Sequence, residues 1–333
     1  MNNSPYFRQP VSVQAVMLKV LAALLPGLAA YVWFFGAAIL VQIALASSAA
    51  LAGEAAMLML RRRPLALFLS DGSALVTAWL LALSLPPLSP WWLTVVATLF
   101  AIIVVKHLYG GLGQNPFNPA MAAFCVVIVA YPQLLSQWPS PASGDFMNQW
   151  QMIFAGAREH VDALTMATPL DALRTGLHAG TGKAAAILGG TQGMGVLAGQ
   201  GWEWVAVGYL AGGLWLIQQR IITWHIPAAF IAVFLAVASA FHLGSADRFA
   251  PPLFHLFSGG ALLCAFFIAT DPVSAATTPR GKLIYAAGIA FLTYIIRVFG
   301  AYPDGIAFAT LLMNICVPLI DMWTQPPVFG HKK

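Results

Sequence analysis

Residues 38–63 read AILVQIALASSAALAGEAAMLMLRRR. Before the three arginines at 61–63 the only charged residue is Glu54, and a helix needs about 20 mostly apolar residues to cross the hydrocarbon core of a bilayer. Lysine or arginine directly after such a run is typical of the cytoplasmic side of a membrane. The stretch therefore predicts a transmembrane helix that ends in the cytoplasm.

The composition of the whole chain points to the same class of protein. Hydrophobic residues make up 60% of the chain and charged residues 8%, whereas soluble globular chains carry roughly 25% charged residues. The formal net charge of +5 does not indicate nucleic-acid binding, because the only basic run, at 61–63, is flanked by apolar segments on both sides. We predict an all-α polytopic membrane protein that binds no nucleic acid.

The same length criterion finds about ten apolar stretches. They lie at residues 17–36, 38–60, 65–86, 91–106, 117–134, 202–218, 224–242, 253–270, 283–300 and 305–323. With both termini in the cytoplasm, the short outer connections hold only one basic residue, Arg248, and most other lysines and arginines fall on the cytoplasmic side. The positive-inside rule therefore predicts cytoplasmic termini.

Three parts of the chain follow from this topology. Residues 1–134 form a first transmembrane half with five spans, residues 135–201 an outer loop, and residues 202–333 a second half with five spans. The segments 69–72 (LSDG) and 257–260 (FSGG) are weakly alike and occupy equivalent places in the third and eighth spans. We therefore predict two inverted five-helix repeats with broken helices.

A pattern typical of covalent flavin attachment occurs in the outer loop. Residues 162–168 (DALTMAT) match Asp-x-x-Ser/Thr-x-Ala-Thr, in which a flavin transferase esterifies the phosphate of FMN to the last threonine. The pattern predicts Thr168 as the acceptor, with Asp162 and Thr165 as its other fixed positions. A purely structural alternative is that Asp162 caps a helix and Thr168 precedes Pro169 at a turn.

A second copy of the pattern occurs at residues 271–277 (DPVSAAT) and ends at Thr277. The predicted topology places Thr277 in a cytoplasmic turn and Thr168 outside. Flavin transferases of this kind act outside the cytoplasmic membrane, so the topology favours Thr168.

Residues 106–120 (KHLYGGLGQNPFNPA) combine glycine, proline and asparagine at the entry to an apolar run. Irregular backbone at membrane depth must line a cavity or be covered by protein. Asn115 and Asn118 carry amides suited to the edge of a flavin ring, while the structural alternative makes Asn118 the cap of a helix that starts at Pro119.

Several charged residues fall in or at the ends of the predicted spans, where a charge costs a few kcal/mol even on lenient insertion scales. We take Asp71, Asp271 and Asp304 as candidates for coupling to an ion, with a buried structural pair as the alternative for Asp71. Glu54 and Asp321 are expected to extend toward the membrane interface. The sequence shows no catalytic nucleophile, general base or metal-ligand cluster.

Five segments together carry a family resemblance: 70–74 (SDGSA), 115–120 (NPFNPA), 165–171 (TMATPLD), 270–274 (TDPVS) and 301–305 (AYPDG). In this order they resemble the RnfD component of the Rnf electron-transport complexes, which is related to the NqrB component of the sodium-pumping NADH:quinone oxidoreductases. Met166, where the quinone-reductase relatives usually have glycine, and the lack of their longer N-terminal extension favour the Rnf branch.

The resemblance implies FMN esterified to Thr168, and a second, noncovalent flavin (riboflavin) for which Asn115 and Asn118 are contacts. It also implies a multi-subunit complex of the bacterial inner membrane that moves electrons between ferredoxin and NAD while it transports Na+ or H+. Its partners would include an outer-face FMN-bearing subunit, an Fe-S membrane subunit and a flavin transferase. The alternatives are a small-solute channel or secondary transporter, which inverted repeats suit equally well, and a structural subunit with vestigial motifs.

Overall fold

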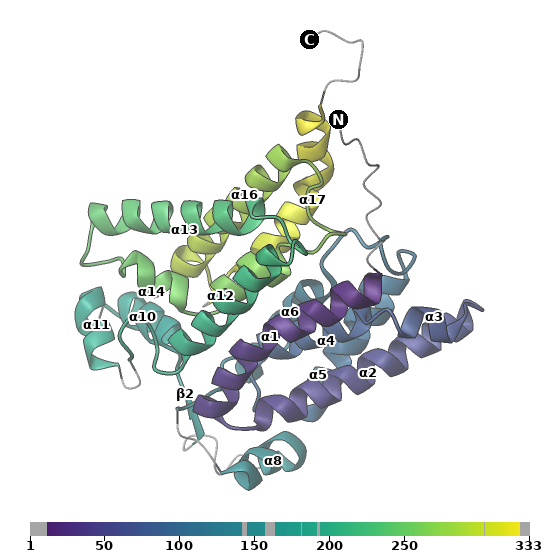
Figure 1. Cartoon of the computed structure of the whole chain (residues 1–333). Helices are drawn as coiled ribbons and strands as arrows, with labels where there is room; N and C mark the ends of the chain where they lie inside the picture. The colour runs from purple at the N-terminus through teal and green to yellow at the C-terminus, as the bar shows by residue number, and fades with distance from the viewer. Residues whose placement is uncertain are drawn as a thin grey trace.

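The computed structural model describes residues 12–141, 145–156, 164–180, 182–191, 194–302 and 304–326. Within these ranges the chain is built almost entirely from helices (Figure 1). The predicted all-α membrane class is confirmed.

Five described helices are long and apolar enough to cross a bilayer. They are α1 (Val13–Phe35), α2 (Ala38–Leu60), α13 (His225–Gly244), α16 (Pro279–Phe299) and α17 (Ile306–Thr324). Each matches a predicted span to within a few residues at its ends. Four shorter apolar elements match other predicted spans. These are α4 (Ser73–Ser84), α5 (Trp91–Leu99) with the π-helix η1 (Phe100–His107), α6 (Pro119–Ala130) and α12 (Trp202–Gln218).

The third and eighth predicted spans are both broken helices. In the third, α3 (Leu65–Leu69) is separated from α4 by a turn in which Gly72 has φ 77°. In the eighth, α14 (Pro252–Phe257) is separated from α15 (Ala261–Leu263) by a turn in which Gly259 has φ 64°, and the π-helix η3 (Cys264–Ile268) follows. Glycine suits both turns because it adopts positive φ without steric cost. The relation of the two halves as inverted repeats stays a prediction.

The two halves of the chain are joined by close packing of α1 against α12. A Cβ atom on Gly208 would lie 2.6 Å from the Cα of Gly27, and one on Gly212 would overlap the carbonyl oxygen of Ala23. Small residues four apart on one helix let two backbones approach in this way, which is a common means of packing helices in membranes. The two helices run side by side in Figure 1.

The connection between the halves folds into short elements at one end of the molecule. It contains α7 (Pro132–Leu135), β1 (Trp138–Pro139), α8 (Phe146–Ala155), β2 (Thr165–Met166), α10 (Pro169–His178) and α11 (Ala184–Gly190). The strands β1 and β2 pair antiparallel, with Trp138 opposite Met166. In Figure 1, α8, α10 and β2 lie at the opposite end of the molecule from the end of α17. The boundaries of the three predicted parts stay predictions.

Gln149 of α8 attaches this connection to the membrane helices. Its amide donates a hydrogen bond to the carbonyl of Phe35 at 2.9 Å and accepts one from the backbone N–H of Ala38 at 3.0 Å. These two residues end α1 and begin α2, so the fully buried Gln149 satisfies backbone groups that a helix end and a helix start leave free.

Candidate functional site

Thr168 is the N-cap of α10. Its Oγ1 accepts a hydrogen bond from the backbone N–H of Asp171 at 3.2 Å, and its hydroxyl donates to Asp171 Oδ2 at 2.9 Å. Pro169 follows at the first helical position, where its missing N–H has no consequence. The structural alternative from the sequence is thus partly realised, with Thr168 as the cap. Asp162 lies outside the described residues, and Thr165 lies in β2.

Thr168 also lines a cavity of about 130 Å³, called here the Thr168 cavity. Aromatic side chains from α1, α12 and the connection form much of its wall. The centre of the Trp202 ring lies 5.4 Å from the centre of the Tyr31 ring and 5.3 Å from that of the Trp138 ring, and both pairs have edge-to-face geometry. The polar residues of the wall, tyrosine and tryptophan apart, are Ser84, Thr168, Asp171, Ser258 and Asp304.

The pKa of the Asp171 carboxyl is raised in this setting. Burial raises the pKa of its carboxyl above the usual value, and the negative charge of Asp304 adds to the increase. The hydrogen bond from Thr168 and the positive charge of Arg174 act in the opposite direction without cancelling the rise in pKa.

Asp304, predicted as an ion-coupling candidate, supports the break of the eighth span. Its Oδ2 accepts from the N–H of Gly260 at 3.1 Å, and its Oδ1 lies 3.2 Å from the guanidinium of Arg297. Arg297 is buried, donates to the carbonyl of His255, and lies with its Cζ 5.3 Å from the centre of the Phe234 ring. Asp304 therefore has a structural partner as well as a position on the Thr168 cavity.

The second copy of the flavin pattern has a different environment. The backbone N–H of Thr277 donates to both carboxylate oxygens of Asp321, at 3.0 and 3.1 Å, and its hydroxyl donates to Asp321 Oδ2 at 2.9 Å. Thr277 is exposed and does not line the Thr168 cavity.

A larger cavity, of about 370 Å³, lies beside Asn118 and is called here the Asn118 cavity. Its walls are apolar except for Ser73, Thr77, Lys106, Asn115, Asn118, Thr270 and Asp271. Pockets of roughly 300–1,000 Å³ with apolar walls and a few convergent polar groups are typical of small-molecule and cofactor sites. Asn115 and Asn118, predicted as flavin contacts, and Asp271, predicted as an ion-coupling candidate, lie in its wall, and these roles stay predictions.

Asn118 caps α6 and also links three parts of the chain. Its Oδ1 accepts from the N–H of Met121 at 3.1 Å, and its amide donates to the carbonyl of Ile268 at 3.3 Å. Its backbone N–H donates to Asn314 Oδ1 at 3.2 Å. Asn115 donates to the carbonyl of Phe117 at 2.9 Å. Both the cap expected from the sequence and the position on a cavity wall hold for Asn118.

Sequence reasoning missed Asn314. It is buried in α17, and its amide donates to the carbonyl of Ser274 at 2.9 Å and to the hydroxyl of Tyr285 at 2.8 Å. A lone asparagine in an apolar run was the available signal, because a buried amide needs partners and marks the helix face that finds them.

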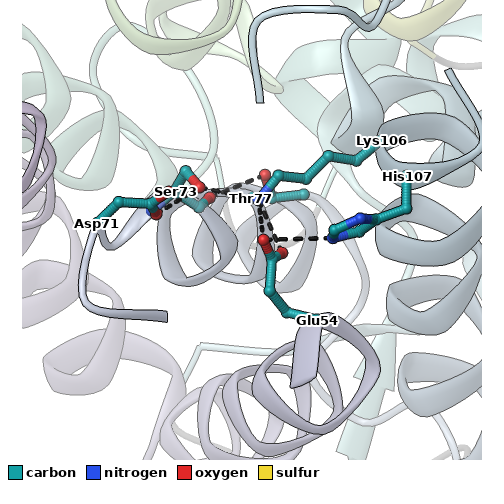
Figure 2. A network of polar contacts seen from close by, with 6 residues as sticks. All are labelled: Glu54, Asp71, Ser73, Thr77, Lys106 and His107. Atoms are coloured by element: carbon teal, nitrogen blue, oxygen red, sulfur yellow. Dashed lines mark hydrogen bonds and ion pairs between the residues drawn. The ribbon is translucent and has the colours of Figure 1, made fainter. Parts of the chain in front are cut away.

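A buried polar network (Figure 2) reaches the wall of the Asn118 cavity through Ser73 and Lys106. Lys106 donates to both carboxylate oxygens of Glu54, at 2.9 and 2.7 Å, and to Ser73 Oγ at 2.8 Å. His107 Nε2 lies 3.3 Å from Glu54 Oε1. Ser73 Oγ in turn donates to Asp71 Oδ1 at 2.6 Å. The network joins α2, the break before α4, and η1.

The expectation that Glu54 extends toward the membrane interface is wrong, because Glu54 belongs to this buried network. Its side chain is 3% exposed and paired with Lys106 rather than extended to the interface, because the π-helix η1 brings Lys106 and His107 to face α2. Asp71 has no direct cationic partner in the described structure and instead accepts from the backbone and side chain of Ser73. Short π-helical segments often occur at functional sites, and no sequence signal indicated this one.

The three predicted ion-coupling carboxylates do not meet in one place. Asp271 lines the Asn118 cavity and accepts from Val273 N–H at 3.2 Å and Ser274 Oγ at 2.8 Å. Asp71 belongs to the network of Figure 2, and Asp304 lines the Thr168 cavity.

The two cavities share a wall. In α6, Met121 lines the Thr168 cavity and its neighbour Ala120 lines the Asn118 cavity. In η3, Ile268 lines the first and its neighbour Phe267 the second. The first turn of α6 and the end of η3 therefore separate the cavities.

Comparison with known proteins agrees with these features. The model of the NQR2, RnfD, RnfE family matches residues 1–330. A protein of Aliivibrio salmonicida, named as the D component of an ion-translocating oxidoreductase complex, is 50% identical over 99% of this chain and 98% of its own length. Proteins named in the same way from Pseudomonas paraeruginosa and Escherichia coli O127:H6 are 49% and 47% identical, over 99% of this chain and 95% and 98% of their own lengths. The chain therefore belongs to the NQR2, RnfD, RnfE family, as a multi-pass membrane protein of the RnfD type found in ion-translocating oxidoreductase complexes.

Proposed function

We propose that this chain is the membrane subunit of a redox-driven ion translocase that holds two flavins, one esterified through its phosphate to Thr168 and one, riboflavin, bound without a covalent bond in the Asn118 cavity. The single observation that carries the proposal is the shared wall between the two cavities. A threonine of the attachment pattern lines one cavity, and the asparagines expected to contact a flavin line the other.

The residues at Thr168 fit a phosphoester. The oxygen that would carry the phosphate belongs to the N-cap of α10, and the dipole at a helix N-terminus stabilises an anion. The aromatic wall made by Tyr31, Trp138 and Trp202 offers stacking surfaces for a flat ring. A covalent tether would keep the cofactor on the outer face, where a free one would be lost.

The Asn118 cavity fits a flavin held without a covalent bond. Its buried amides at Asn115 and Asn118 can donate to ring carbonyls, and Phe266 and Phe267 supply an apolar surface. Lys106 also lies in the wall, where its positive charge is paired with Glu54. A flavin supplies the electron chemistry once bound, and the protein sets its position and electrostatics.

The carboxylates near the two cavities support coupling of electron transfer to movement of a cation. An electron that enters a low-dielectric bundle favours uptake of a cation nearby, because the two charges interact strongly there. Asp71, Asp271 and Asp304 are our candidates to respond, one near the network of Figure 2 and one at each cavity. Unchanged ion transport in vesicles after their replacement by asparagine would contradict this assignment.

We further propose that the protein lies in the bacterial inner membrane, with both termini in the cytoplasm and α8, α10 and β2 outside. Electrons would reach the outer flavin from an FMN-bearing partner subunit and an Fe-S membrane subunit, and link ferredoxin and NAD chemistry to Na+ or H+ transport. The position of α8, α10 and β2 opposite the end of α17 supports this sidedness.

The decisive experiment is the intact mass of the purified chain, followed by peptide mapping across residues 162–174. We expect an adduct with the mass of an FMN phosphoester on Thr168, and its loss in Thr168→Ala. An adduct on Thr277 would keep the redox role and overturn the proposed topology. A chain without any adduct, from cells with an active flavin transferase, would instead favour a solute channel or transporter.

A further inference from the structure

The hydroxyl of Thr168 is held in a geometry suited to nucleophilic attack. Its proton points to Asp171 Oδ2 at 2.9 Å, and one oxygen lone pair accepts the backbone N–H of the same aspartate at 3.2 Å. The second lone pair is left for a phosphorus atom. A hydroxyl with a carboxylate base within about 2.6–3.2 Å is the arrangement by which proteins activate weak oxygen nucleophiles.

We propose that Asp171 is the general base for attachment of the flavin phosphate to Thr168, so that the acceptor chain supplies one catalytic group to its own modification. The inference rests on the proposed function, because it presupposes that Thr168 is the attachment site.

The atoms in the transfer of the flavin phosphate to Thr168 balance when a flavin dinucleotide is the donor. Thr168 Oγ1 attacks the phosphorus that bears the flavin and forms the O–P bond. The pyrophosphate P–O bond breaks, and the nucleoside monophosphate leaves with the electron pair. Asp171 takes the proton from Oγ1 and then releases it to solvent. No oxidant or reductant is required.

The surroundings of Asp171 suit this role. Its carboxyl faces Arg174 of its own helix and Asp304 from the segment before α17. Burial raises the pKa of Asp171 above its usual value, and the negative charge of Asp304 adds to the rise. A higher pKa makes the carboxylate a stronger base, and proton transfer is most effective when the pKa of the base lies near the operating pH. The hydrogen bond from Thr168 and the positive charge of Arg174 act against this rise in pKa.

A purely structural role for Asp171 predicts a different contact. In a capping box the side chain at the third helical position accepts from the backbone N–H of the cap residue. The carboxylate of Asp171 accepts instead from the hydroxyl of the cap residue, which is the reacting group. Helix capping is already provided by Thr168 Oγ1 and does not need the carboxylate.

The test is flavin transfer to the full-length chain, purified in detergent without flavin and incubated with flavin adenine dinucleotide and a flavin transferase. We compare the wild type with Asp171→Asn, whose amide oxygen still accepts the hydroxyl hydrogen bond but is not a base. We expect kcat to fall by about 10²–10⁴-fold, the range for loss of a general base, with KM unchanged. The wild-type rate should fall at low pH where Asp171 becomes protonated, and the variant should lack that fall.

Two further variants make the outcome specific. Asp145→Asn alters another aspartate that caps a helix of the connection, α8, and whose carboxylate accepts from the backbone N–H of Met147; it should transfer at the wild-type rate. Asp171→Glu retains a carboxylate and should restore part of the lost rate. Wild-type kcat in Asp171→Asn, or a change confined to KM, would overturn the inference and indicate recognition by the transferase instead. A wild-type chain that takes no flavin would overturn the proposed function itself.

Discussion

Replacing Lys106 by methionine tests whether the network of Figure 2 holds its part of the helix bundle together. Lys106 and Glu54 are each 3% exposed, and Lys106 donates three hydrogen bonds of 2.7 to 2.9 Å, two to Glu54 and one to Ser73. Methionine keeps much of the length of the side chain and removes the charge. The substitution leaves the Glu54 carboxylate buried with His107 as its remaining close partner.

The expected loss in the free energy of unfolding follows from the burial of the ion pair rather than from the distance between its charged groups. Removing one partner of a buried pair costs about 3–5 kcal/mol, because the other charge stays desolvated. Replacing both partners by uncharged residues of similar size is often neutral or stabilising. Glu54→Gln alone should also destabilise, whereas Glu54→Gln with Lys106→Met should return close to the wild type. The coupling energy, which is the change in the double variant minus the sum of the two single changes, should therefore exceed the cost of Lys106→Met alone, about 3–5 kcal/mol in magnitude.

The assay is unfolding of the four proteins in mixed micelles with increasing SDS, followed by circular dichroism and by tryptophan fluorescence. A control pair, Lys183→Met and Asp247→Asn, removes a bridge of 3.0 Å whose side chains are 69% and 63% exposed, and should change the free energy of unfolding by less than about 1 kcal/mol. If the single substitutions at Lys106 and Glu54 were as mild as the control, or simply added in the double variant, the reasoning from burial would be refuted.

Three other predictions follow from the described contacts. Gly212→Leu should prevent α1 from packing on α12, because even a Cβ there overlaps the Ala23 carbonyl oxygen, and loss of monodisperse protein on size-exclusion chromatography would show it. Thr277→Ala should leave the FMN content of the chain at the wild-type level, since Thr277 contacts Asp321 on the proposed cytoplasmic side, away from the transferase; a reduced content by fluorescence of the denatured protein would contradict the topology. The raised pKa of Asp171 means that the folded state holds its proton more tightly than the unfolded state, so stability should fall as pH rises through that pKa; Asp171→Asn should lack this fall in thermal unfolding.

Most of the membrane helices could be predicted because their signal is local. The apolar run 38–60 coincides with α2 to the residue, and the glycines at 72 and 259 mark turns that require positive φ. The pairing of β1 with β2 and the position of α8 on the end of α1 were not predictable, because both depend on contacts between residues far apart in the sequence.

The residues of the candidate site also fall into those that a local motif predicts and those that only the fold brings together. Thr168, Asn115 and Asn118 belong to motifs that can be recognised in the sequence alone. Glu54 and Lys106 are 52 residues apart, and nothing in either local segment indicates that they pair. Their meeting depends on η1, since a π-helix differs from an α-helix in the direction of its side chains and has no sequence signature.

The irregular parts of the membrane helices share one property that links fold to function. Polar backbone in the hydrocarbon region is tolerated only where protein covers it or where it lines a cavity. Gly259 and Gly260, at the break of the eighth span, line the Thr168 cavity, and Lys106, at the end of η1, lines the Asn118 cavity together with Thr270 and Asp271. The backbone therefore departs from regular helix where a cavity needs polar groups. This arrangement supports the proposal that the protein holds polar cofactors inside a membrane.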